Sequence, residues 1–468
     1  MVVSLRFRSL ANRMALFNSA DLMTRPLKWV KCTHYQWAIA IVLFLTAHHR
    51  ANSQPLPTGA NFTFKGRYIV AVSDADMVAS AYLDGHLGPP EGQDALSVIP
   101  LNKPVGQLKA VAIEASNSVT GPPSSVAVSP DGRYAVVIET RGRRPPAKSD
   151  PRLADLPTGK TISVIDLLDV EHPKLSQRLD GPERPLSVQF TRDGALVAIT
   201  YRPQDPKQSP LAVYRFEAGK LVDLSRPDMP GYAAGDIVNG LAFHPSQDEL
   251  VVLNATQSTL CFFKFNAQGT TFRLTPWGNA VRVDPEPFKA QFTPNGRFVV
   301  VNAMYPGSVQ GSVTAVGLAV DTTADGSPRH QLVSRALAGV LPEGLTMSPD
   351  GQWLVTTNLE QSTQPVGNAQ QGFYSSLSLL HLDPESGFLE RVGDYSFDGI
   401  LPESVVFDNS SRYLAVATFD HYDGRKPGGS IDFWRLTGDY YNPKRIELVK
   451  TGYSVPVTRG VHSMVIVR

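Results

Sequence analysis

Cysteine is nearly absent from this chain of 468 residues, which has only Cys32 and Cys261. We expect Cys32 to be removed with an N-terminal segment, so that Cys261 remains alone and an intramolecular disulfide is excluded. A cysteine pair that holds zinc or haem is excluded for the same reason. Cys261 falls in a strand-like apolar run, where the expected role is that of a small apolar side chain.

An excess of charge of either sign is also missing, since 44 Lys and Arg face 43 Asp and Glu, for a net charge of +1. Binding of nucleic acid needs a surplus of basic residues, so we expect no such partner. Motifs of nucleotide-binding glycine loops, metalloprotease helices and serine nucleophile elbows are absent, and no cofactor is indicated. What the chain does have is 42% hydrophobic residues with 37 Gly and 37 Pro, which favours a large core of strands joined by turns.

Long apolar runs are missing too, apart from one near the N-terminus. The run Trp37–Ala47 has about half of the ~20 residues that a membrane-spanning helix needs. Basic residues precede it and a polar stretch ending at Ser53 follows, an order typical of a secretory signal peptide. We therefore expect an N-terminal region of residues 1–53, an exported (periplasmic or extracellular) domain of residues 54–468, and membrane contact only through the signal segment if it stays uncleaved.

One sequence phrase recurs along the rest of the chain: an alternating apolar segment, a tight turn such as Pro-Asp-Gly, and a second apolar segment. Proline sets the first torsion of such a turn, and Asp, Asn and Gly tolerate the next, so each phrase predicts a β-hairpin. The copies recur roughly every 50 to 60 residues, a period typical of four-stranded propeller blades. Six copies begin at Ser124, Leu186, Asn239, Phe288, Glu343 and Glu403.

The two ends of the chain supply a seventh unit. Gly460–Val467 resembles a first strand without its turn, and Lys65–Val72 resembles a turn and second strand without the first. Pairing them would remove open sheet edges, which invite aggregation. The sequence thus predicts an all-β fold, a seven-bladed β-propeller whose ring is closed by N- and C-terminal segments sharing one blade. We expect it to be a monomer.

The second strands that end at Asn254, Asn302 and Asn358 resemble those of the Tyr-Val-Thr-Asn repeat propellers. That group includes the seven-bladed lactonase family of 6-phosphogluconolactonase and carboxy-muconate cyclase type, and the resemblance spans Asn61 to Arg468. It implies the same fold and, as one alternative, a lactonase-like hydrolase or cyclase. Members of the family commonly open the first strand with Pro, a basic residue or His, and then His. Here the Pro is kept in five repeats, but no repeat has the His.

The default site of a propeller is the mouth of its channel, where first strands begin and second strands end. At the start of the first strands, Glu343, Glu403 and His462 fall on three consecutive blades. Two carboxyl groups near a histidine suit general acid and base catalysis, so these three are the candidate catalytic residues. Asp74 and Asp76, after the second strand of the closing blade, are candidate ligands of a divalent cation.

Further polar residues near the same mouth are candidates for ligand binding: Arg184, Asn239, Lys289, Arg459 and His421. The alternative is that both glutamates are simply solvated, or neutralised by Arg184, Lys289 and Arg459. The charged loop of residues 139–160 either receives an anionic ligand or is a mobile surface loop. The first functional hypothesis is an exported propeller that binds a small molecule or protein partner at its channel mouth. The alternatives are a lactonase-like hydrolase and a metal-dependent hydrolase on the same carboxylates.

Overall fold

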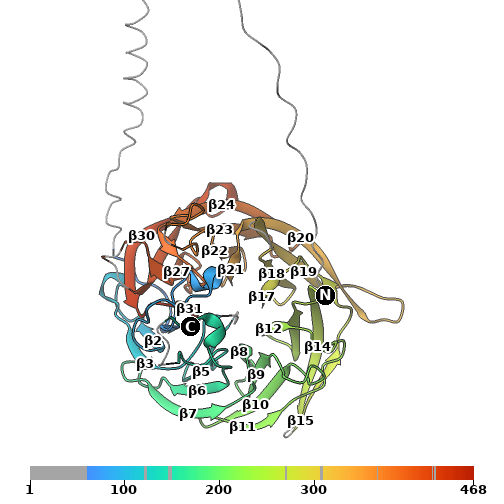
Figure 1. Ribbon diagram of the computed structural model, residues 1–468. Coiled ribbons are helices and arrows are strands. Elements are labelled where there is room, and N and C mark those ends of the chain that lie inside the picture. The colour runs from blue at the N-terminus through green and yellow to red at the C-terminus, as the bar shows by residue number, and fades with distance from the viewer. Residues whose placement is uncertain are drawn as a thin grey trace, which may run out of the picture. The chain divides into compact units, whose positions relative to one another are not determined.

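The computed structural model describes residues 61–120, 124–145, 150–268, 271–305, 309–365, 367–423, 425 and 428–468. They belong to the unit Thr58–Arg468, and the expected signal segment and Cys32 lie outside them. The repeated hairpins form seven blades arranged as a ring around a central channel (Figure 1). The predicted all-β, seven-bladed propeller is therefore confirmed.

Each blade is built on four antiparallel strands, which follow one another in chain order from the channel outward in all blades but the seventh. The first two blades consist of β4 (Val126–Val128), β5 (Tyr134–Ile138), β6 (Thr161–Asp166) and β7 (Lys174–Asp180), then β8 (Pro185–Phe190), β9 (Leu196–Tyr201), β10 (Leu211–Glu217) and β11 (Lys220–Ser225). The third consists of β12 (Val238–Phe243), β13 (Glu249–Asn254), β14 (Thr259–Gln268) and β15 (Thr271–Pro276), with β16 (Val281–Arg282) added beside β14. The fourth consists of β17 (Pro287–Phe292), β18 (Phe298–Ala303), β19 (Gln310–Thr322) and β20 (Pro328–Val340). The fifth and sixth consist of β21 (Pro342–Met347), β22 (Trp353–Asn358), β23 (Ser375–Leu382) and β24 (Leu389–Phe397), then β26 (Ser404–Phe407), β27 (Tyr413–Thr418), β29 (Gly429–Gly438) and β30 (Ile446–Val457).

The seventh blade is built from both ends of the chain, as predicted. Its innermost strand is β31 (Val461–Val467), followed outward by β1 (Tyr68–Ser73), β2 (Ala95–Pro100) and β3 (Val111–Glu114). The antiparallel register pairs Tyr68 with Val467 and Ser73 with Val461, and shifts by a bulge between Val72 and Ser73. Because β31 pairs with β1, the ring has no break between the first and last strands of the chain.

The turns show why the recurring phrase folds into hairpins. Gly132 and Gly351 have φ of 77° and 74°, in the left-handed region that glycine tolerates best. Ser129 Oγ donates to Asp131 Oδ1 (2.6 Å) and accepts a hydrogen bond from the N–H of Tyr134 (2.9 Å). The serine of Ser-Pro-Asp-Gly is therefore a turn residue and not a nucleophile.

The hydrophobic core is divided among the interfaces between neighbouring blades. Each of the seven interfaces has its own cluster of buried side chains, and an eighth cluster lies at the channel mouth. Trp353 is fully buried between the fifth and sixth blades, in contact with side chains of both. Removing such a side chain costs about 3–5 kcal/mol, so the ring is stabilised at every joint.

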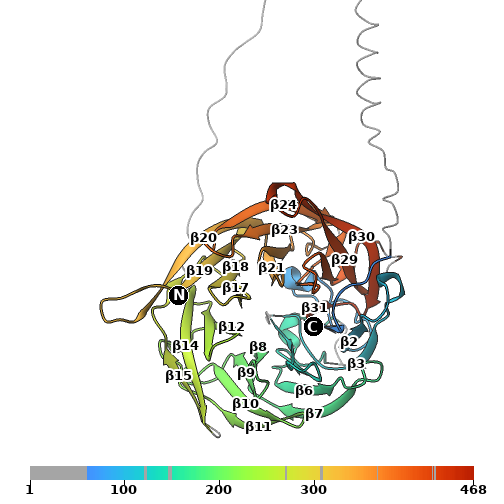
Figure 2. The same cartoon turned by 180° about the vertical axis from the view of Figure 1, so that it is seen from behind.

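A segment between β1 and β2, Asp74–Asp94, turns inward instead of forming a short hairpin. It contains the one-turn helix α2 (Ala81–Asp84), which ends at Gly85 in the left-handed conformation (φ 73°). In Figures 1 and 2, which view the ring from opposite sides, this short blue helix lies inside the ring beside β21. Among the described residues, no helix is long and apolar enough to span a bilayer.

The remaining elements are short. They are the 3-10 helices η1 (Val105–Gln107), η2 (Leu153–Asp155) and η3 (Pro443–Arg445), and the two-residue strands β25 (Gly399–Ile400) and β28 (Asp420–His421), which pair with each other. Cys261 lies half-buried in β14 against the cluster of the second and third blades, in keeping with its expected role.

Candidate functional site

The backbone at the channel mouth places the first residues of neighbouring blades in the same way. The residue just before the opening proline has a positive φ in four blades: Arg184 (52°), Glu286 (53°), Leu341 (52°) and Leu401 (48°). This conformation costs a residue other than glycine about 1–2 kcal/mol. It recurs in register, so it belongs to how the chain enters each blade. On the fifth and sixth blades it is followed two residues later by Glu343 and Glu403.

Glu343 and Glu403 form a carboxyl pair in a poorly solvated environment. Glu343 is buried and Glu403 is half-buried. Burial raises the pKa of Glu343 to about 8. Burial, and next the charge of Glu343, raises the pKa of Glu403 well above its usual value. The two groups are therefore close neighbours that retain protons at neutral pH.

The carboxyl pair has an unused bonding capacity. The Oε2 atom of Glu343 is buried and accepts no hydrogen bond from any residue that the structure describes. An unpaired buried polar atom costs about 1–3 kcal/mol. Such an atom in a folded protein needs an explanation, and a bound ligand or a reacting group is one that a channel mouth can provide.

Tyr82 of helix α2 is the third member of this cluster. Its Oη lies 2.9 Å from Glu403 Oε1 and 2.9 Å from the carbonyl oxygen of Val119. Burial, and then the charge of Glu403, raises the pKa of Tyr82, so the phenol keeps its proton. Ala81, next in the chain, packs in the apolar cluster with Phe419. Helix α2 therefore brings a proton-bearing hydroxyl group to the carboxyl pair.

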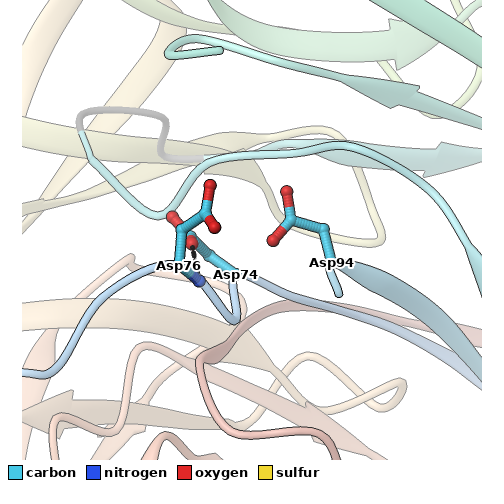
Figure 3. Close-up of side chains that lie close together, drawn as sticks. All are labelled: Asp74, Asp76 and Asp94. Atoms are coloured by element: carbon cyan, nitrogen blue, oxygen red, sulfur yellow. Dashed lines mark hydrogen bonds between the residues drawn. The ribbon is translucent and has the colours of Figure 1, made fainter. Parts of the chain in front are cut away.

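Three aspartates form a second acidic group at the same end of the channel. Asp74 and Asp76 follow β1, and Asp94 directly precedes β2. Figure 3 shows their carboxyl groups turned toward one another, and one oxygen of each lies within 4.8 Å of the others. The backbone N–H of Val119 donates to Asp74 Oδ2 (3.0 Å) and that of Ala75 to Asp94 Oδ1 (3.0 Å). Each carboxylate oxygen has a second lone pair, so the group can also offer the oxygen ligands that Ca²⁺ and Mg²⁺ prefer.

Two guanidinium groups fix the segment that carries the aspartates. Arg459 donates to the carbonyl oxygen of Pro89 (2.6 Å). Burial raises the pKa of Asp74 to about 6, and its backbone hydrogen bonds and the charge of Arg459 oppose this rise only in part. Arg144 donates from its guanidinium to the carbonyl oxygen of Asp76 (3.0 Å) and from its backbone N–H to the carboxylate of Asp76 (3.0 Å). Both guanidinium groups thus donate to carbonyl oxygens of the inward segment, and Arg459 also pairs with Glu91.

His462 lies at the bulge of β31 and contacts an asparagine. Its Nε2 is 2.7 Å from Asn117 Oδ1. The amide of Asn117 donates to the carbonyl oxygens of Ser73 and Ala115 (2.9 Å each), which orients Oδ1 as the acceptor. His462 Nε2 therefore carries the proton, and burial lowers the pKa of the ring to about 3. Its Nδ1 is a buried base with no hydrogen-bond partner among the described residues.

Two predicted ligand-binding residues have contacts within the fold. Asn239 Nδ2 donates to the carbonyl oxygen of Pro287 (3.4 Å), which ties the third blade to the fourth. His421 lies in β28, with Nε2 3.0 Å from Ser430 Oγ. Both side chains are half-buried, and their roles in binding stay predictions.

The three basic residues expected to neutralise the glutamates do not pair with them. Arg459 lies 3.5 Å from Glu91, and Lys289 faces the channel cavity. Arg184 has no ion pair within the described ranges, and its Nε is buried without a partner. The interpretation of the two glutamates as salt-bridged groups is therefore wrong for the structure as described.

The charged loop of residues 139–160 packs across the mouth. Arg143 forms an ion pair with Glu114, and Leu156 is buried in the same apolar cluster as α2. His86 of the inward segment and Arg152 of the loop form a β-bridge. The loop is thus anchored at both its middle and its end, while residues 146–149 lie outside the described part of the chain.

Sequence reasoning missed Tyr82, Asp94 and Asn117. None of them falls in the recurring phrase, and Tyr82 and Asn117 lie outside the strands. The available signal was length, because the interval between β1 and β2 is far longer than the few residues of a hairpin loop. Loops of that length in a compact domain are usually functional.

Comparison with known proteins finds no matching family model and no similar curated protein. Solved structures do match along most of the chain. A proposed 6-phosphogluconolactonase from Bacteroides uniformis has a TM-score of 0.58 at 14% identity, covering 86% of this chain and 100% of that one. The periplasmic gluconolactonase PpgL of Pseudomonas aeruginosa has a TM-score of 0.56 at 16% identity, with coverage of 86% and 99%. The fold is that of the lactonase-type propellers. At these identities the likeness concerns the fold alone.

Proposed function

We propose that the chain is a lactonase-like hydrolase whose active site is the carboxyl pair Glu343 and Glu403 at the channel mouth. The observation that carries the proposal is the pair itself: a buried and a half-buried carboxyl group on adjacent blades, without a basic partner among the described residues and with one oxygen unpaired. Carboxyl groups whose pKa values are raised in this way are typical of general acid and base catalysts.

The two glutamates have different parts in the proposed reaction. Glu343, whose Oε2 is unpaired, acts as the base: its carboxylate takes a proton from a water molecule, whose oxygen then bonds to the lactone carbonyl carbon. Glu403 remains protonated and donates its proton to the ring oxygen as the ring C–O bond breaks. The product is an open-chain hydroxy acid, and one proton has moved from Glu403 to Glu343 through the substrate. Tyr82 orients Glu403 through its hydroxyl group.

The named activities of the structural relatives support this choice of substrate class. One is called a gluconolactonase and another a proposed 6-phosphogluconolactonase, and both share the seven-bladed architecture. Lactone hydrolysis needs one base and one acid, which a carboxyl pair with a shared low-polarity environment supplies.

The test is hydrolysis of glucono-δ-lactone, followed by proton release above the spontaneous rate. Glu403→Gln should lower kcat/KM about 10²–10⁴-fold, the range expected for loss of an acid or base catalyst. Glu171→Gln, on an exposed loop, is the matched control and should leave the rate unchanged. Full activity of Glu403→Gln would rule out this pair as the catalyst.

The second candidate function is binding of a small molecule or protein partner at the mouth without turnover. The apolar packing of α2 favours it, because Ala81, Leu401 and Phe419 form a buried apolar cluster next to the helix that carries Tyr82. Binding with no activity on any lactone, lost in Tyr82→Ala, would support this function instead.

A divalent cation at Asp74, Asp76 and Asp94 is a further part of the proposal. Chelator treatment that abolishes hydrolysis would show that the reaction depends on a metal. An unchanged rate would mean that the cation only stabilises the segment Asp74–Asp94.

We also propose that the protein is exported, which the N-terminal sequence and the periplasmic relative support. Mass spectrometry of the secreted protein would test cleavage near Ser53.

A further inference from the structure

A cavity of about 750 Å³ lies in the channel and extends to its opposite end, where the hairpin turns are. The first strands of all seven blades contribute to its wall, from β4 to β31. It reaches the turns that contain Pro130 and Pro294, and Lys289 lines it from the beginning of β17. The cavity is therefore distinct from the carboxyl pair at the mouth.

The described wall of this cavity contains basic side chains and no aspartate or glutamate. Two of the basic residues have an acidic neighbour: Arg192 lies near Asp193, and Arg468 lies near Asp408, whose charge partly offsets the burial that lowers the pKa of Arg468. Lys289 is different, because its side chain has no hydrogen bond or ion pair with any residue in the described ranges. Of the lysine and arginine side chains that line the described wall, it is the one with no aspartate or glutamate beside it.

The Lys289 side chain is half-buried, so its ammonium group is less well solvated than that of an exposed lysine. Burial alone lowers the pKa of Lys289 to about 8, so it still carries a charge at neutral pH. An anion that enters the cavity would supply the missing counter-charge, and the gain would be larger than at an exposed lysine because the surroundings are poorly solvated.

Neutral polar side chains surround this charge. Gln291 lies two residues after Lys289 on β17 and so on the same side of the strand. Gln189 of β8 and Ser463 of β31 also line the cavity, and none of the three makes a side-chain hydrogen bond within the described part of the chain. Amide and hydroxyl groups can donate to an oxyanion and can also bond to alcohol groups of a ligand.

We propose that the channel cavity binds a small polyhydroxy carboxylate, with its carboxylate on Lys289 and its hydroxyl groups on Gln189, Gln291 and Ser463. A single ammonium group balances one negative charge. Phosphate groups carry closer to two charges and are more often held by the forked donors of arginine. Arg192 and Arg468 each lie near an aspartate, so the charge left to a ligand is that of Lys289, which fits a carboxylate better than a phosphate. The inference does not depend on the proposed hydrolysis at the mouth.

The experiment measures protection of Lys289 in the full chain with sodium gluconate as the probe. Acetic anhydride acetylates amines, and mass spectrometry compares the rate at Lys289 with that at the exposed Lys220. Gluconate should slow acetylation of Lys289 at least about 5-fold at saturation and leave Lys220 unchanged. Equal rates with and without gluconate would overturn the proposal. Protection by inorganic phosphate but not by gluconate would overturn the assignment to a carboxylate.

Two variants of Lys289 and one control variant complete the test. Lys289→Met removes the charge and should abolish the heat of gluconate binding in titration calorimetry, while Lys289→Arg keeps the charge and should retain it. Lys220→Met is the matched control and should bind as the unmodified protein does. Gluconate binding by Lys289→Met with undiminished affinity would refute the role of Lys289. The labelling experiment uses the unmodified chain, so it decides the question even if a variant fails to fold.

Discussion

The sharpest prediction concerns Glu343→Gln and the pH dependence of stability. The pKa of Glu343 is about 8 in the folded chain, against 4.5 for an exposed glutamate. Below pH 4.5 both states are protonated and the group has no effect. As the pH rises from 4.5 toward 8 only the unfolded state ionises, so stability is lost progressively over this window. At ~1.4 kcal/mol per pH unit, the loss is about 3 kcal/mol by pH 7.

Glutamine has nearly the same shape as glutamate and does not ionise, so it removes this loss. The free energy of unfolding of Glu343→Gln, relative to that of the unmodified protein, should rise by about 3 kcal/mol from pH 4.5 to pH 7. This holds whatever the difference between the two proteins is at pH 4.5. Urea unfolding at several pH values measures the difference. Glu171→Gln, whose side chain is exposed, is the control and should give curves parallel to those of the unmodified protein.

Parallel curves for Glu343→Gln from pH 4.5 to pH 8 would refute the reasoning, because they would mean that the buried carboxyl group ionises as freely as an exposed one. The proposed roles of acid and base would then fall with it, since they depend on the raised pKa values of the pair. The same titration predicts that kcat/KM for a lactone rises with pH up to about 8, as Glu343 becomes the base.

Three further predictions concern other parts of the fold. Deleting residues 459–468 removes β31, so the ring should not close, and circular dichroism should show loss of the cooperative melting transition. Trp353→Ala should lower the free energy of unfolding by about 3–5 kcal/mol, because the side chain is fully buried, while Tyr441→Ala, which is 98% exposed, should leave it unchanged. Asp94→Asn should weaken Ca²⁺ binding in calorimetry if the aspartates hold a cation, and equal affinity in the variant and the unmodified protein would exclude that role.

The fold was predictable because its information is local and repeated. Each hairpin has its own alternating strands and its own turn, such as the one from Ser129 to Tyr134, and the period between copies indicates a blade. Even the pairing of β31 with β1 followed from the sequence, because each end lacks the half-blade that the other supplies. The turn of the third blade differs from the others. Gln247 stands there in place of the glycine and has no positive φ. Its backbone N–H donates to His244 Nδ1 (2.9 Å).

The site was predictable only in part, because it combines repeated and unrepeated residues. Glu343 and Glu403 could be located, since they occupy the same position of adjacent repeats. His462 occupies that position too, but the bulge at β31 and the fixed amide of Asn117 give it a different partner. Tyr82 and Asp94 come from a segment without periodicity, and its course inside the ring depends on tertiary packing that no local pattern records.

The shared blade also sets the order in which the chain can mature. In the seventh blade β1 is the second strand and β31 is the first. This blade is therefore complete only after residues 461–467 have paired with β1. A chain that crosses a membrane with its N-terminus leading would therefore stay open until its last strand had crossed. The other six blades need no part of β31, so it is closure of the ring, and not the folding of each blade, that would be left to the destination compartment.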